Sequence, residues 1–153
     1  MQTHIELEEA VELITASLSP LGTELLPRLE ALERTLAQDL PAPMDQPPFD
    51  RSPLDGYALR SADLVGASRE HPVVLPVVEI VYAGGVPSRP LAAGEAMRIM
   101  TGAMLPVGCD CVLQHERTNN GMEQVEIYAP LSPHQDYCDR GEDYRAGTVL
   151  LPA

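Results

Sequence analysis

Aromatic residues and positive charge are scarce in this sequence. Its 153 residues include no Trp and one Phe, and aromatics make up 4% of the chain. A hydrophobic core must therefore be built mainly from aliphatic side chains. Lys and Arg number 10 against 23 Asp and Glu, which gives a formal net charge of −13. Because phosphate binding needs a basic surface, this balance argues against nucleic acid and anionic membranes as partners.

Long apolar runs are also lacking. The longest, residues 73–78, is short and contains Pro76, whereas a membrane-spanning helix needs about 20 apolar residues. Glu6, Glu8 and Glu9 give the N-terminus the wrong charge for a secretory signal. We therefore expect a cytoplasmic protein.

The three cysteines do not form a recognisable framework. Cys109 and Cys111 are two positions apart and Cys138 is distant, so the C-x₂-C pair that is typical of zinc sites is missing. A metal site made by these thiols with His134 is the less favoured alternative. We expect reduced thiols, as is usual in the cytosol.

Helical periodicity is confined to the first 40 residues. Thr3-x-x-Glu6 has the form of a capping box that opens a helix, and Ser19-Pro20 ends that helix. The apolar positions between them recur at three- and four-residue steps: Leu7, Ala10, Val11, Ile14 and Leu18. A second helix is predicted over residues 31–40, where leucines recur four apart. An amphipathic helix at a chain end is also a candidate dimer contact.

After residue 40 the pattern favours short strands and turns. The chain holds 15 Pro and 11 Gly, which argues against an all-helical bundle. A short helical piece is predicted over residues 57–65. Strands are predicted at 73–83, 96–100, 111–116, 122–128 and 148–151. Asn119-Asn120-Gly121 predicts a hairpin between the strands at 111–116 and 122–128, because both turn positions tolerate positive φ. The expected fold class is α+β.

The most informative stretch runs from Pro47 to Asp63 and reads PPFDRSPLDGYALRSAD. Its prolines stiffen the chain, and Asp55-Gly56 is a typical turn dipeptide because Gly accepts positive φ. The stretch therefore presents Ser52 and Asp55 on a rigid loop. The alternative is an ordinary tight turn with solvated charges.

Three sets of polar residues are candidates for chemistry. The Asp55 carboxylate can coordinate Mg²⁺ beside substrate phosphates or act as a general base. Thr101, at the end of a predicted strand, has a hydroxyl and, with Gly102, free backbone N–H groups that suit an oxyanion. Glu142 and Asp143 are adjacent acids, for which a solvated acidic loop is the alternative.

The stretch from Pro47 resembles the signature of the molybdopterin molybdenumtransferase family, which comprises bacterial MoeA and the matching domain of gephyrin. Its common form is P-x-F-D-N-S-A-M-D-G-Y-A. Three further segments match in the same order: RIMTG at 98–102, Gly-Glu-Asp at 141–143 and AGTVLL at 146–151. The resemblance covers nearly the whole chain from about residue 5.

The resemblance implies a discontinuous N-terminal domain, residues 1–45 and 141–153, with a β-rich domain of short strands, 46–140, inserted between. It places the family's active-site positions on Asp55, on Thr101-Gly102 and on Gly141-Glu142-Asp143. We therefore expect Asp55 and Asp143 to be catalytic and Ser52, Thr101, Gly102 and Glu142 to bind substrate, with Asp55 as the candidate Mg²⁺ ligand. These site residues are: Asp55, Asp143, Ser52, Thr101, Gly102 and Glu142. The implied reaction uses Mg²⁺ to cleave adenylylated molybdopterin, inserts molybdate and releases AMP. The implied partners are a second copy of the chain, a molybdopterin-adenylylating protein and proteins that deliver the cofactor.

The sequence also departs from the family pattern. Arg51 replaces the common Asn, and a cation usual before Gly141 is lost at residues 136–138. The family's α/β ligand-binding domain has no counterpart, so we expect a piece of a longer enzyme that is inactive alone. The alternatives are a non-catalytic dimerisation or protein-interaction module of gephyrin type and, less favoured, a small Mg²⁺-dependent hydrolase using acids that include Asp50.

Overall fold

A computed structural model describes residues 4–19 and 21–153, and its contacts divide the chain into two compact units. The residues up to Asp39, together with Pro152–Ala153, form the first unit, and Leu40–Leu151 form the second. The domain limits that the resemblance implies, at 45/46 and 140/141, stay a prediction.

The first unit contains one α-helix, α1 (Leu7–Ser17), which confirms the amphipathic helix predicted there. Thr3 of the predicted capping box and Pro20 of the predicted stop lie outside the described residues. No residue of α1 is buried, so its apolar stripe is not covered by the described residues of this unit. Val11 and Ile14, for example, are 53% and 61% exposed.

The second predicted helix, over residues 31–40, is wrong. The chain instead forms a single 3₁₀ turn, η1 (Arg28–Glu30), followed by irregular backbone. Glu33 has φ +65°, which lies in the left-handed region and is incompatible with a right-handed helix through that residue. Helices gain most of their stability from packing an apolar face, and Leu32, at 83% exposed, buries little surface here.

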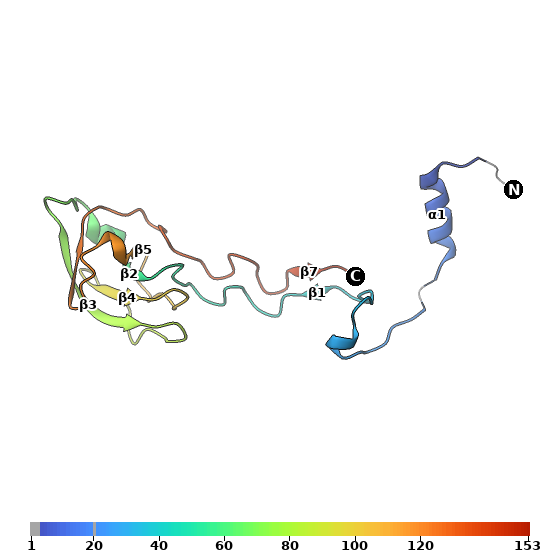
Figure 1. Cartoon of the computed structure of the whole chain (residues 1–153), viewed down its shortest axis with the longest axis horizontal. Helices are drawn as coiled ribbons and strands as arrows, with labels where there is room; N and C mark the ends of the chain where they lie inside the picture. Colours follow the sequence, from blue (N-terminus) through green and yellow to red (C-terminus); the bar gives the residue numbers. More distant parts are fainter. Residues whose placement is uncertain (1–3, 20) are drawn as a thin grey trace. The chain divides into compact units, whose positions relative to one another are not determined.

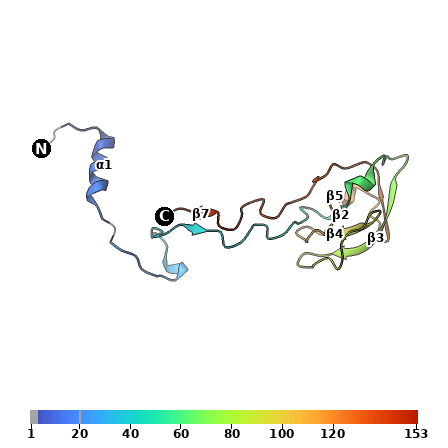
Figure 2. The same cartoon turned by 180° about the vertical axis from the view of Figure 1, so that it is seen from behind.

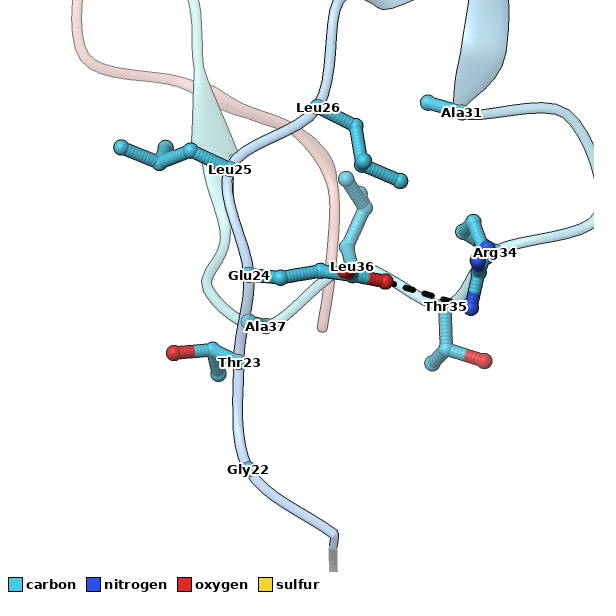
Figure 3. Close-up of a pocket in the computed structure, with 10 residues that line it drawn as sticks. All are labelled: Gly22, Thr23, Glu24, Leu25, Leu26, Ala31, Arg34, Thr35, Leu36 and Ala37. Carbon is cyan, nitrogen blue, oxygen red and sulfur yellow. Dashed lines mark ion pairs between the residues drawn. The ribbon is translucent and has the colours of Figure 1, made fainter.

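An irregular loop of the first unit encloses a pocket of about 430 Å³ (Figure 3). Leu26 and Leu36 point into it, whereas Leu25 points away and is fully exposed. Glu24 and Arg34 form an ion pair of 3.3 Å beside it, and both side chains are largely exposed. Such exposed pairs contribute little stability, so this one does not fix the shape of the loop.

The second unit is built on a five-stranded curled sheet with the order β5-β2-β4-β3-β6 (Figure 1). Its strands are β2 (Gly56–Leu59), β3 (Val73–Val81), β4 (Ala96–Ile99), β5 (Cys111–Gln114) and β6 (Gln124–Ile127). Neighbours are antiparallel except for β3 and β4, which are parallel. The predicted strands at 73–83, 96–100, 111–116 and 122–128 are thus confirmed in position.

The short helical piece predicted over residues 57–65 is wrong in its first half. Residues 57–59 belong to β2, and a 3₁₀ turn, η2 (Ser61–Leu64), follows. Every residue of β2 is buried because the strand lies between β4 and β5. A strand buried on both faces loses the alternating pattern that identifies strands in sequence, which explains the error.

The predicted hairpin between residues 111–116 and 122–128 is also wrong, because β5 and β6 occupy opposite ends of the sheet. The chain does turn at Asn120, which has φ +54°. After β5, however, it enters a 3₁₀ turn, η3 (His115–Arg117), which ends the ladder. The Asn119 side-chain oxygen accepts hydrogen bonds from Gly121 N (3.2 Å) and Glu126 N (3.0 Å), so the turn is tied to β6 and not to a β5–β6 ladder.

Alternate residues of the strands feed two hydrophobic clusters, one on each face of the sheet. Tyr57 and Leu59 of β2 belong to the first, and Ala58 belongs to the second with Met97 and Ile99 of β4. All five are fully buried. Both faces of β2 and β4 are therefore covered, and the ends of these two strands are held firmly.

Two segments far apart in sequence, residues 40–51 and 138–151, run side by side from the sheet (Figures 1 and 2). At their far end β1 (Leu40–Pro41) pairs with β7 (Val149–Leu151), which confirms the predicted last strand. Further backbone hydrogen bonds join them, including Gln46 N to Tyr144 O at 2.8 Å. The segments thus form a two-chain ribbon that carries the signature.

No helix in the described ranges, 4–19 and 21–153, is long and apolar enough to cross a membrane.

Acid is expected to weaken the link between η2 and the start of β5. Asp110 accepts hydrogen bonds from Ser61 N and Ser61 Oγ, each of 2.6 Å. Burial tends to raise the pKa of Asp110, but these bonds hold it below its ordinary value of 3.8. A depressed carboxyl pKa stabilises the fold above the unfolded-state value, and this stability is lost as the pH falls through the folded-state value.

The test compares the free energy of unfolding of the wild type and Asp110→Asn at several pH values. We expect the wild type to have the higher free energy of unfolding at about pH 6, and we expect the difference from Asp110→Asn to shrink below about pH 4. Asp136→Asn, at an exposed position, serves as the control. A difference that stays constant down to about pH 2 would contradict the link.

Candidate functional site

The signature brings the other two predicted site segments together, because residues 50–52 lie between them as an added strand. Arg51 bridges Met104 on one side and Cys138 on the other. Arg51 N donates to Cys138 O at 2.9 Å, and Ser52 N donates to Ala103 O at 3.0 Å. The segments with Thr101-Gly102 and with Glu142-Asp143 are therefore held to one backbone segment, although 40 residues separate them.

The Asp55 carboxylate is fixed by Thr101. Its Oδ1 accepts one hydrogen bond from Thr101 Oγ1 at 2.6 Å and one from Thr101 N at 2.7 Å. These two bonds, and next the charges of His115 and Arg98, hold the pKa of Asp55 below its usual value. Asp55 is exposed, so an ionised carboxylate faces solvent in a set orientation.

The expectation that Thr101 and Gly102 offer free N–H groups to an oxyanion is wrong for this conformation. Thr101 N–H and its hydroxyl proton are both given to Asp55. Gly102 N donates to Ser52 O at 2.8 Å. A backbone donor that is already paired is not available to a second anion, so Thr101 here serves to orient the Asp55 carboxylate.

Ser52 lies inside the protein. It is fully buried, and its hydroxyl donates to Leu54 O at 2.6 Å. The bond closes a local turn that leads the chain from the ribbon toward Asp55. Its predicted contact with substrate stays a prediction, and its contacts here hold the loop in shape.

Gly56 is required for a reason other than the one that the sequence indicated. It begins β2, and its φ does not lie in the left-handed region that Gly102 adopts. A Cβ at Gly56 would lie 2.1 Å from the Leu113 carbonyl oxygen of β5. Glycine here permits close approach of two strands directly beside Asp55.

Glu142 and Asp143 are exposed on the ribbon. Asp143 N donates to Gln46 O at 2.9 Å, and Gly141 N donates to Pro47 O at 2.9 Å. The backbone around both acids is thus tied to the residues that open the signature, and both side chains are exposed to solvent.

Two aspartates that we did not predict to bind substrate clamp this acidic segment. Asp50 accepts hydrogen bonds from Tyr137 OH at 2.7 Å and Arg140 N at 2.8 Å. Asp45 accepts from Ala146 N at 2.8 Å and pairs with the Arg140 side chain, and these contacts lower the pKa of Asp45. Asp50 belongs to the signature, but the signature does not indicate its clamping role, and Asp45 lies outside every motif.

Metal ligands are few in the described residues, where no group of three or more His, Cys, Asp or Glu could hold an ion. The Asp55 carboxylate is a donor of the type that Mg²⁺ prefers, and Mg²⁺ commonly needs only one or two carboxylates besides substrate phosphates. Cys109 is buried and donates to Cys111 O, and burial raises the pKa of its thiol to about 11. It therefore stays an unreactive thiol at neutral pH.

The chain belongs to the family described as MoeA N-terminal region (domain I and II), whose model matches residues 5–153. It is 42% identical over 147 residues to the molybdopterin molybdenumtransferase of Synechococcus elongatus and 37% identical over 154 residues to that of Bacillus subtilis. The matched regions span 93% and 98% of this chain, respectively, but only 36% of each relative.

Solved structures agree with this assignment. The molybdopterin biosynthesis MoeA protein from Pyrococcus horikoshii OT3 matches with a TM-score of 0.85 and 34% identity, over 95% of this chain and 38% of that one. The chain thus corresponds to an N-terminal part of enzymes named molybdopterin molybdenumtransferase, and it spans about a third of their length.

Proposed function

We propose that this chain forms part of a molybdenum-cofactor biosynthesis enzyme that inserts molybdate into adenylylated molybdopterin and releases AMP. The observation that carries the proposal is the Asp55–Thr101 pair, in which two hydrogen bonds fix an ionised, exposed carboxylate. Family membership supports the same reading. Asp143 and Glu142 supply further carboxylates on the neighbouring segment.

In this proposal Asp55 takes part in the reaction as a Mg²⁺ ligand or general base. An ionised carboxylate suits both roles, since a metal ligand and a base must each be deprotonated. The chain carries a net charge of −13, and its substrate is an anion. Cations must therefore come from Mg²⁺ and from the part of the enzyme that this chain does not include. Thr101, Gly102, Ser52 and Glu142 shape the substrate side of the site.

We also propose that the first unit mediates association. Its helix α1 has no buried residue, and two leucines that follow it, Leu25 and Leu29 (in η1), are 101% and 88% exposed. Exposed apolar faces of this kind commonly mark a protein contact. A second copy of the same enzyme is the proposed occupant, with the adenylylating and cofactor-delivering proteins as transient partners in the cytoplasm.

A chimera tests the proposed function. The part of the Bacillus subtilis enzyme that aligns with this chain is replaced by residues 5–153, and the product is expressed in cells that lack their own transferase. We expect molybdoenzyme activity to return, with the parent enzyme as the positive control. A chimera that is soluble and dimeric but restores no activity would overturn the proposal and favour a purely associative role.

A further inference from the structure

Arg98 is a buried charged residue that has no carboxylate in contact. It is 8% exposed and forms no ion pair among the described residues. Its Nη1 donates to Tyr57 OH at 2.7 Å and to the Asn120 side-chain oxygen at 2.6 Å, and the guanidinium lies 4.9 Å from the centre of the Tyr57 ring. Its Nε is buried without a hydrogen-bond partner in the described structure. Burying a charge with only neutral partners is costly, so the position calls for an explanation.

The first part of the explanation is the register of β2 and β4. Tyr57 and Arg98 are direct partners in this antiparallel ladder. Asp55 lies two residues before Tyr57, and Thr101 lies three residues after Arg98. The Asp55–Thr101 hydrogen bonds therefore close a small ring whose other end is the Arg98–Tyr57 bond. A change in the register of β2 and β4 at one end of this ring would therefore displace the residues at the other end.

A second ring runs through the turn that follows β5. Tyr57 OH donates to Gly121 O at 2.8 Å, and Asn120 N donates to Thr118 Oγ1 at 2.9 Å. The Thr118 hydroxyl in turn donates to His115 O at 2.7 Å. These bonds connect Gly121 and Asn120, through Thr118, with His115 beside the candidate site.

The second ring also ends at Asp55, because His115 N donates to the Asp55 carbonyl oxygen at 3.1 Å. The side chain of Asp55 is thus fixed through the first ring and its backbone through the second. Arg98 is the shared member, since its one nitrogen binds both Tyr57 and Asn120.

We propose that Arg98 is a positioning residue for Asp55, acting through Tyr57 and Asn120 on the carboxylate and on the turn at residues 115–121. A guanidinium suits this task because its planar, fixed donors can orient two acceptors at once, whereas an ammonium is a flexible point charge. The stacking of Arg98 on the Tyr57 ring adds a contact that is insensitive to the exact donor angle. The consequence for catalysis rests on the proposed function, but the geometry does not.

The test uses the 153-residue chain with Arg98→Met, which keeps an unbranched but shorter side chain and removes both hydrogen bonds. We expect amide hydrogen exchange at Thr101 and His115 to become about tenfold faster, and the Thr101 amide proton to shift upfield as its bond to the carboxylate lengthens. Exchange at Val125 of β6, which lies outside both rings, reports sheet stability and should change little. Arg117→Met, at an exposed position on η3, is the matched control.

Two further variants keep the proposal falsifiable if Arg98→Met does not fold. Tyr57→Phe retains the ring and removes the hydroxyl that accepts from Arg98 and donates to Gly121 O, so exchange at Thr101 and His115 should become about threefold faster. Arg98→Lys retains the charge and should fail to restore protection fully. If amide exchange at Val125 and at Thr101 became faster by the same factor in the folded variants, Arg98 would act only on the stability of the sheet. That result would overturn the proposal. Loss of chimera activity is measured separately, so a failure of the proposed function leaves the exchange result readable.

Discussion

Replacing Asp55 by Asn is expected to abolish molybdoenzyme formation by the chimeric enzyme. Asn keeps the size of the side chain and can still accept hydrogen bonds from Thr101, which now meet a neutral amide oxygen. It removes the negative charge that a Mg²⁺ ligand or a general base needs. Because losses of this kind remove a reacting group, activity should fall by about a hundredfold or more.

The change should leave the fold intact, which a thermal melt of the 153-residue chain can verify. Asp136→Asn is the matched control, because Asp136 is exposed and Asn tolerates its φ of +52°. That control should keep full activity. A chimera with Asp55→Asn that supported normal molybdoenzyme activity would remove Asp55 from the reaction, whatever the rest of the site does.

The substitution Gly56→Ala is expected to cause the largest loss of stability in the second unit. The added methyl group would lie 2.1 Å from the Leu113 carbonyl oxygen, which belongs to the backbone of β5 and cannot rotate away. The β2–β5 ladder would have to separate, at a cost of about 3 kcal/mol or more in the free energy of unfolding. Asp55 precedes this residue, so the site should be disturbed with it.

Urea denaturation followed by Tyr fluorescence measures this loss. The chain has no Trp, and all of its five Tyr residues lie in the second unit, so the signal reports that unit alone. Gly66→Ala is the control: its Cβ would meet nothing within 4 Å, but its φ of +83° costs a side chain about 1 kcal/mol. If both variants lost equal stability, backbone conformation rather than strand contact would explain the requirement for glycine.

The strands at 73–83, 96–100, 111–116 and 122–128 could be predicted because their residues favour extended backbone and turn residues bound them. Which strands pair could not. The Asn-Gly turn at residues 120–121 has the local chemistry of a hairpin, yet β5 pairs with β2, which precedes it by some 50 residues. Strand order depends on burial across the whole sheet, and a local turn pattern does not contain that information. The predicted helix at 31–40 failed for a related reason, since periodicity alone supplies no surface on which to pack.

At the site, the ordered motifs located Asp55, Thr101 and the acidic pair. They did not indicate which groups were already engaged with one another. The Thr101 N–H, which the sequence left open to an anion, is given to Asp55. Arg98 and Asp45 escaped notice because a charged residue in a strand or a loop reads as solvated until its burial and partners are known. Their contacts arise from residues 22 to 101 positions away in the chain.

The pairing of β1 with β7 has a consequence for how such a protein can be rearranged. Leu40 and Leu151 are register partners, and Cα atoms in such pairs lie about 5 Å apart. The 112-residue piece between them therefore enters and leaves through a gap no wider than the spacing of two strands. A few residues of linker would close that gap, whether to join the flanking chain after excision or to fuse the two ends for circular permutation. The piece is therefore expected to be inserted into a host chain, or removed from it, with little strain on the rest of that chain.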